Sequence, residues 1–254
     1  MHRKGFDASS SSARSAGCQP AACGSPQRYA YLTAGAPGAG RLNTVPGRIL
    51  WDVDTQVDFM LPHGKLYVPG AEKTAPAMAR LVAAAREAGL VHFASADDHE
   101  LTDPEISSDP DWRNTYPPHC LRGTHGATRI PETEQDDPLP FGLTPYPPGL
   151  VPGLVEGRRE ILLLKKNFDV FTNPNTDALL EALDPEEIVV FGVASDVCDD
   201  AAIRGFLRRG HRVRFVEDAA RGLDEERVTA CIAAWREGGV AFATADEVVA
   251  DLSG

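Results

Sequence analysis

The stretch EIVVFGVASDVCDDAAIRGFLRR, residues 187–209, contains the pattern that decides the fold. Residues 187–193 form an almost continuous apolar run, which predicts a strand that is buried on both faces. Residues 195–209 then follow a helical spacing and end at Gly210. A buried strand that leads directly into a helix is typical of the repeating unit of an α/β sheet.

The same alternation of strand and helix extends in both directions from this stretch. We expect strands at Arg48–Val53, Leu90–Ser95, Glu160–Leu164, Glu187–Val193, Arg212–Val216 and Val240–Ala243, and helices at Thr74–Ala88, Asn175–Leu183, Ser195–Arg209 and Asp224–Glu237. TADE at 244–247 has the form of a capping box for a last short helix. Residues 97–152 are expected to be irregular. The sequence therefore predicts an α/β fold of three layers, with a mainly parallel six-stranded sheet and helices on both faces.

Composition and charge exclude several classes of protein. The 254 residues include 25 Lys and Arg against 37 Asp and Glu, which gives a net charge of −12. An acidic chain is a poor partner for nucleic acid or anionic lipid, because phosphate binding requires a basic surface. Five scattered cysteines argue against a disulfide framework, and no apolar run is long enough for a membrane span. We therefore expect a cytoplasmic protein with no nucleic-acid or membrane partner.

The first 46 residues differ from the rest of the chain. Ser, Gly, Ala and Pro fill 25 of these 46 positions, and no apolar period is sustained. We expect residues 1–46 to be a disordered extension and residues 47–254 to be the folded domain. The extension has two interpretations: a targeting peptide, since it is nearly free of acids, or a non-native segment from a start codon assigned too early.

Chemically active side chains follow four of the expected strands. Asp54 comes after the first strand, Asp97 and His99 after the second, Lys165 after the third and Cys198 after the fourth. Active sites of parallel sheets lie at the carboxyl ends of the strands. The topology therefore predicts that these side chains share one edge of the sheet.

Cys198 is the candidate nucleophile at this edge. A thiol in the first turn of a helix is expected to have a lowered pKa, because the helix dipole favours the thiolate. Asp54 is then a candidate general base, and Lys165 a candidate for stabilising negative charge. Each residue also has an ordinary interpretation on its own: a small buried thiol, a capping aspartate and a surface lysine.

A second group has the residue types of a metal site. Asp97 and His99 form a D-x-H pair, His119 follows twenty residues later, and Glu105 lies between them. Imidazole and carboxylate ligands suit zinc, iron or manganese. Solvated loop residues remain the alternative interpretation of such a loose spacing.

Taken together, these segments resemble one family. The pattern D-x-Q-x-D-F at 54–59, the D-x-H pair, PPHC at 117–120 followed by GTHGA at 123–127, and GVASDVC at 192–198 occur in order. Over residues 47–252 the chain resembles the nicotinamidase/pyrazinamidase branch of the isochorismatase-like cysteine hydrolases. Glu105 stands where this branch often has His, and Tyr116 where Trp is frequent.

The resemblance implies a function and a set of roles. It implies hydrolysis of nicotinamide, or a similar aromatic amide, to nicotinate and ammonia through a thioester, assisted by one divalent metal ion, zinc first and iron or manganese otherwise. It implies catalytic roles for Asp54, Lys165 and Cys198, an oxyanion hole from the N–H groups of Ala194 and Cys198 next to a cis Val193–Ala194 peptide, metal ligation by Asp97, His99, Glu105 and His119, and ring contacts from Phe59 and Tyr116.

Other functions stay open at this point. The main alternative is a related cysteine hydrolase that acts on another small amide. A vinyl-ether hydrolase of the same superfamily uses no cysteine nucleophile, so Cys198 argues against it. A catalytically inactive binding or metal-storage protein is a further alternative. A homo-oligomer also stays open, and the Pro-rich segment 134–158 is expected to be a lid or an oligomer contact.

Overall fold

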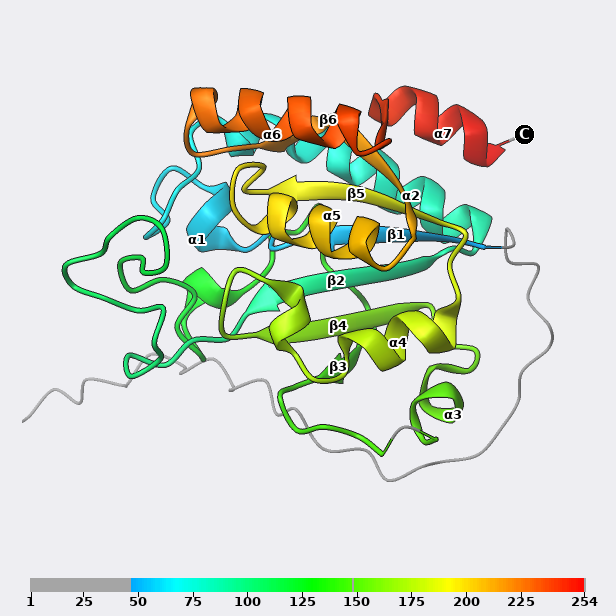
Figure 1. The fold of residues 1–254 in the computed structure, drawn as a ribbon, viewed down its shortest axis with the longest axis horizontal. Coiled ribbons are helices and arrows are strands. Elements are labelled where there is room, and N and C mark those ends of the chain that lie inside the picture. Colours follow the sequence, from blue (N-terminus) through cyan, green and yellow to red (C-terminus); the bar gives the residue numbers. More distant parts are fainter. Residues whose placement is uncertain (1–46, 148, 254) are drawn as a thin grey trace, which may run out of the picture. The chain divides into compact units, whose positions relative to one another are not determined.

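The computed structural model describes residues 47–147 and 149–253, so the prediction for residues 1–46 lies outside the described residues. The central feature of the described residues is one parallel sheet in the order β3-β4-β2-β1-β5-β6-β7 (Figure 1). Its strands are β1 (Arg48–Val53), β2 (Val91–Asp97), β3 (Leu139–Phe141), β4 (Glu160–Lys165), β5 (Glu187–Val193), β6 (Arg212–Arg221) and β7 (Ala241–Ala243). The predicted α/β class is confirmed.

Helices cover both faces of this sheet. Helices α2 (Ala75–Ala88) and α7 (Ala245–Ser253) pack on one face. Helices α3 (Val151–Val155), α4 (Thr176–Leu183), α5 (Cys198–Arg208) and α6 (Glu225–Glu237) pack on the other. Short helical turns occur at α1 (Val57–Met60), η1 (Ala71–Lys73), η2 (His125–Ala127) and η3 (Val170–Thr172). In the described ranges, no helix combines the length and apolar character that a membrane crossing requires.

The central strands are apolar because both of their faces are buried. In β1, Ile49, Trp51 and Val53 point to the α4–α5 side, and Leu50 points to the α2 side. Trp51 stacks on Phe93 of β2 with ring centroids 3.9 Å apart. This alternation within a continuous apolar run is what a parallel sheet between two helical layers requires.

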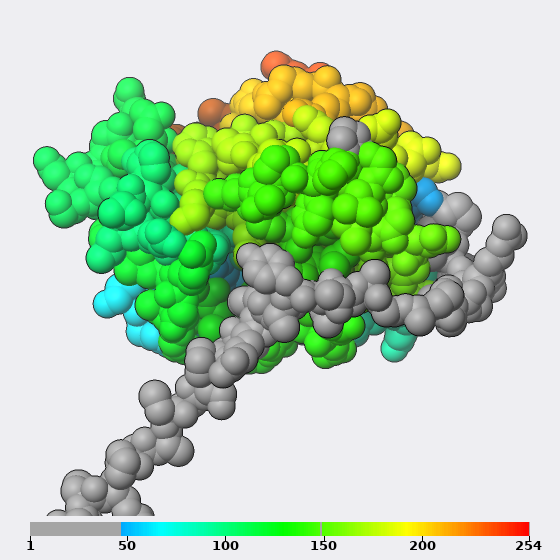
Figure 2. Space-filling model, turned by 90° about the horizontal axis from the view of Figure 1, so that it is seen from below, coloured from blue at the N-terminus to red at the C-terminus, as the bar shows by residue number. Residues whose placement is uncertain are grey.

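The prediction of six strands was wrong by one. The additional strand is β3, which lies in the segment 97–152 that was expected to be irregular. Pro140 at its centre has no N–H group, and a proline is tolerated in an edge strand that pairs on one side only. β3 is such an edge and pairs with β4 alone. Seen from the side of β3, the long connection between β2 and β4, in green, forms much of the surface (Figure 2).

Several element ends also differ from the expected ones, and two of these matter for the site. β2 and β4 run on to Asp97 and Lys165, which are therefore the last residues of their strands rather than residues of the following loops. A side chain on a strand is held more firmly than one on a loop. The capping box before α7 is confirmed, since the Thr244 N–H donates to Glu247 and the Glu247 N–H donates to the Thr244 hydroxyl.

Gly205 in α5 provides a test of this packing. Replacing a helix-interior glycine by alanine normally stabilises a helix by up to about 1 kcal/mol. A Cβ at Gly205, however, would overlap the ring of Phe171. We expect Gly205→Ala to lower the free energy of unfolding by about 1–3 kcal/mol, as overpacking does, measured by chemical denaturation. The matched control is Gly153→Ala in α3, where a Cβ meets nothing within 4 Å; a stabilised Gly205→Ala would contradict the packing.

Candidate active site

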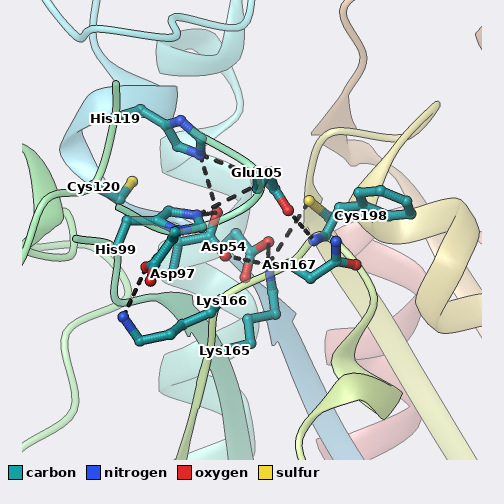
Figure 3. A network of polar contacts seen from close by, with 12 residues as sticks. Asp54, Asp97, His99, Glu105, His119, Cys120, Lys165, Lys166, Asn167 and Cys198 are labelled. Atoms are coloured by element: carbon teal, nitrogen blue, oxygen red, sulfur yellow. Dashed lines mark hydrogen bonds and ion pairs between the residues drawn. The ribbon is translucent and has the colours of Figure 1, made fainter. Parts of the chain in front are cut away.

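The residues predicted to share an edge of the sheet do so. Asp54 follows β1, Asp97 ends β2, Lys165 ends β4 and Cys198 begins α5 directly after the β5 turn. Because β4, β2, β1 and β5 are consecutive neighbours in the sheet, their carboxyl ends bring the four side chains together (Figure 3).

Lys165 lies at the centre of this group. Its Nζ is fully buried and lies 2.8 Å from Asp54 Oδ2, 2.5 Å from Asp97 Oδ1 and 4.0 Å from Cys198 Sγ. Burial lowers the pKa of Lys165, but the carboxylates of Asp54 and Asp97 outweigh it and hold the pKa well above its ordinary value. The ammonium is therefore a permanent positive charge between two carboxylates.

Asp54 is held in an unusual backbone conformation. Its φ is 51°, in the left-handed region that non-glycine residues seldom adopt. Ser95 fixes this geometry, because its carbonyl accepts the Asp54 N–H and its hydroxyl donates to Asp54 Oδ1 at 2.8 Å. Burial raises the pKa of the Asp54 carboxyl in spite of the Lys165 ammonium, so the group has a stronger affinity for a proton than an ordinary aspartate.

Cys198 is the first residue of α5 and is only 7 % exposed. The expectation that the helix dipole would lower the pKa of this thiol was wrong. Burial raises its pKa well above the ordinary value in spite of the Lys165 ammonium, and the negative charges of Asp54 and Asp97 act in the same direction as burial. The resting sulfur is a neutral thiol, so a reaction at Sγ needs a base to take its proton.

The predicted metal ligands also converge. Asp97, His99, Glu105 and His119 are all buried, and one ligand atom from each lies within 4.8 Å of the others. The group fits a cation in two further ways. His99 Nε2 is buried without a hydrogen-bond partner among the described residues. Burial and the Asp97 carboxylate raise the pKa of Glu105 to about 7, which shows two acids crowded where a divalent ion would balance them.

The sequence reasoning gave no role to Gln56, yet this residue joins the two groups. Its Nε2 donates to the carbonyls of Asp97 and Ala127 at 2.8 and 2.9 Å, and its Oε1 accepts the Asp97 N–H at 2.7 Å. Asp58 holds the loop that carries His119, since its carboxylate accepts the Cys120 N–H at 2.7 Å. The D-x-Q-x-D-F pattern was the sequence signal that could have revealed the roles of Gln56 and Asp58, because polar side chains in a buried segment need hydrogen-bond partners.

The site opens into a small pocket whose lining is mainly apolar. Phe59 and Tyr116 lie in its wall, as the resemblance implied for ring contacts, and Cys198 and Ala194 line it as well. The remaining lining residues are Leu66, Val68, Asp97, Glu105, His119, Phe168, Val197 and Leu223, of which the apolar ones were not foreseen. No described residue of segment 134–158 lines the pocket.

The turn before Cys198 is the last part of the site. The Val193–Ala194 peptide is cis, as the resemblance implied. The Ala194 carbonyl accepts the N–H groups of Val197 and Asp199 at 2.9 and 3.1 Å. These bonds close a tight turn, and Ala194 and Cys198 at its two ends both line the pocket.

With this geometry established, the comparisons with known proteins decide the family. The model of the isochorismatase domain matches residues 49–247. The chain belongs to the isochorismatase family. A curated nicotinamidase/pyrazinamidase of Mycobacterium tuberculosis is 28 % identical over 195 residues, which cover 76 % of this chain and 96 % of that protein. This isochorismatase-like hydrolase is therefore similar to an amidohydrolase along almost the whole length of that relative.

Solved structures agree on the fold. A pyrazinamidase of Pyrococcus horikoshii in complex with zinc matches with a TM-score of 0.61 and 21 % identity, covering 78 % of this chain and 99 % of that one. An N-carbamoylsarcosine amidase of Thermoplasma acidophilum matches with a TM-score of 0.60 and 24 % identity, covering 79 % and 97 %. At these identities the likeness concerns the fold alone.

Removing the buried ammonium tests the electrostatics of the site. In Lys165→Met, Asp54 and Asp97 lose the charge that offsets their burial, and we expect the free energy of unfolding to fall by about 3–5 kcal/mol at pH 7. The deficit should narrow as the pH is lowered, because protonation neutralises the two carboxylates. Chemical denaturation at several pH values measures both effects. Lys65→Met, at an exposed lysine, is the control; an equal loss in both variants would refute the argument.

Proposed function

We propose that this protein is a metal-assisted cysteine amidohydrolase that converts nicotinamide to nicotinate and ammonia through a thioester. The observation that carries the proposal is the contact of the Lys165 ammonium with Asp54, Asp97 and the Cys198 thiol, beside a four-residue group suited to a metal. The similarity to a nicotinamidase/pyrazinamidase over 96 % of that enzyme supports the choice of substrate.

The first half of the reaction forms the thioester. Asp54 takes the thiol proton as Cys198 Sγ attacks the carboxamide carbon, and a C–S bond forms while the carbonyl π electrons move to oxygen. The amide N–H groups of Ala194 and Cys198 stabilise this oxyanion. The oxyanion then re-forms the carbonyl, the C–N bond breaks, and the proton on Asp54 passes to the leaving nitrogen to release ammonia.

The second half releases the acid. Asp54, now ionised again, takes a proton from a water molecule, and the oxygen of that water molecule attacks the thioester carbon. The C–S bond breaks, the sulfur recovers the proton from Asp54, and the product leaves as nicotinic acid, which loses its carboxyl proton to solvent and becomes nicotinate. The raised pKa of the Asp54 carboxyl suits both directions of transfer, since a base that is too weak would not accept the thiol proton.

In this mechanism Asp54 transfers the protons, and Lys165 acts only through its positive charge. Its ammonium holds both carboxylates in place and offsets the negative charge that builds up on sulfur. Because Lys165 is fully buried and its own pKa is well above the ordinary value, it acts by charge and not by giving up a proton.

The pocket suits a flat aromatic amide. Phe59 and Tyr116 lie in its wall and would offer ring faces and edges to such a ligand. Asp97, His99, Glu105 and His119 would hold the divalent ion, zinc first and iron or manganese otherwise. When bound, the ion supplies a Lewis-acid contact for the ring nitrogen, directly or through water, and so orients the carboxamide toward Sγ.

The nucleophile is tested by substitution. Cys198→Ala is expected to lower the rate of ammonia release from nicotinamide by more than about a thousandfold, because no thioester can form. Cys231→Ala, at another buried thiol, is the matched control and should keep the rate of the unchanged protein. Release of ammonia by Cys198→Ala would reject the mechanism. No release by the unchanged protein would indicate a different small amide as substrate.

The metal is tested by chelation. Dialysis against a chelator is expected to suppress ammonia release, and added zinc, iron or manganese should restore it, because the ring then regains its contact. His99→Ala should bind less metal by elemental analysis and should not be restored. Full activity in the metal-free protein would remove the metal from the mechanism and leave the cysteine chemistry in place.

A further inference from the structure

The two histidines of the metal group face it with the same ring nitrogen. His99 Nε2 lies 3.6 Å from Asp97 Oδ2, and His119 Nε2 lies 3.3 Å from the same oxygen. Each Nδ1 has an acceptor on the opposite side. For His119 this acceptor is the carbonyl of Pro117 at 2.8 Å, and for His99 it is the side chain of Asp103 at 3.4 Å.

Asp103 is held firmly in that position. Its Oδ2 accepts the Glu100 N–H at 2.8 Å, which closes the turn that follows His99. The same oxygen lies 2.7 Å from the Lys166 Nζ. The carboxylate is only 12 % exposed and the lysine side chain 23 % exposed, so solvent competes weakly for these contacts.

Lys166 is next to Lys165, and the two side chains serve different groups. Side chains of successive residues at a strand end point to opposite sides. Lys165 reaches Asp54 and Asp97, whereas Lys166 reaches Asp103 behind His99. Lys165 is therefore not the surface lysine of its ordinary interpretation from sequence, and Lys166 has a partner of its own.

A histidine ring that donates through Nδ1 carries its lone pair on Nε2. We propose that Asp103, held by Lys166, is a positioning residue that fixes His99 in this tautomer and orientation and so prepares Nε2 to bind the metal ion. The inference rests on the metal site of the proposed function. The unpartnered Nε2 of His99 agrees with it, because that atom is buried and accepts no hydrogen bond from the described residues. Outer carboxylates of this kind strengthen histidine ligation in other metal sites.

The test compares zinc affinity and tautomer in the full chain. Asp103→Ala and Lys166→Met are titrated with Zn²⁺ in competition with a chromophoric chelator, and the metal-free proteins are examined by ¹⁵N NMR of the His99 ring. We expect Asp103→Ala to bind Zn²⁺ about 10- to 100-fold more weakly and to lose the defined Nδ1–H tautomer. Lys166→Met should shift both readouts in the same direction by less.

Two further variants separate positioning from folding. Lys166→Arg keeps the ion pair and should recover the zinc affinity that Lys166→Met loses. Glu100→Gln, at an exposed acid on the same turn that pairs with Arg122 instead, should bind Zn²⁺ as the unchanged protein does. If Asp103→Ala does not fold, the Lys166→Met and Lys166→Arg pair still decides the question.

The outcomes distinguish the inference from the proposed function. Unchanged zinc affinity and an unchanged His99 tautomer in Asp103→Ala and Lys166→Met would overturn the positioning role and leave the metal site standing. Absence of zinc binding in the unchanged protein would overturn the metal site and the positioning role together. Loss of affinity with a retained Nδ1–H tautomer would also overturn the role, since Asp103 would then act by another route.

Discussion

The contact on which the rest of the site depends is the buried ammonium of Lys165 between the carboxylates of Asp54 and Asp97. No one of these three charges is tolerable alone in a fully buried position, because each has lost its hydration. Asp97 meets Lys165 through Oδ1 and the His119 ring through Oδ2. One carboxylate is therefore shared by the hydrolytic group and the metal group, so the geometry of either group constrains the other.

The sheet order makes this arrangement possible. The strands lie in the order β4-β2-β1-β5 in the sheet, although their order in the chain is β1, β2, β4, β5. Lys165 at the end of β4 therefore reaches Asp54 after β1 across the end of β2, although the two residues are 111 positions apart in the chain (165 − 54). The apolar residues of these strands are buried in the core on both faces of the sheet. The free energy gained by this burial offsets the cost of desolvating the charged groups at the strand ends. Gln56 and Ser95, whose side chains are uncharged, then set the positions of Asp97 and Asp54 through hydrogen bonds.

Much of this could be predicted from the sequence, and the limits have physical causes. Long apolar strands and caps identified the layers, and the strand-end rule brought together Asp54, Asp97, Lys165 and Cys198. β3 was missed because Pro140 argues against a strand unless the strand is known to lie at the edge of the sheet. Gln56 was not given a role because a neutral amide gives no sign of its acceptors. The pKa of Cys198 was misjudged because a local helix effect was weighed without the burial that only the packed structure reveals.

The environments of the two aspartates separate their chemistry. Burial raises the pKa of Asp54, whereas for Asp97 burial is outweighed by the Lys165 ammonium and the His119 and His99 rings, which hold its pKa well below the usual range. Two carboxyl groups that contact one lysine thus differ in proton affinity. A group that holds its proton more readily suits transfer to and from a thiol, and a group that stays ionised suits a cation. The neutral resting state of Cys198 follows the same logic, since a thiolate would place a third negative charge beside the single ammonium. In the proposed mechanism the thiol proton therefore moves to Asp54 only as Sγ attacks, because the negative charge then moves from sulfur to the carbonyl oxygen of the substrate.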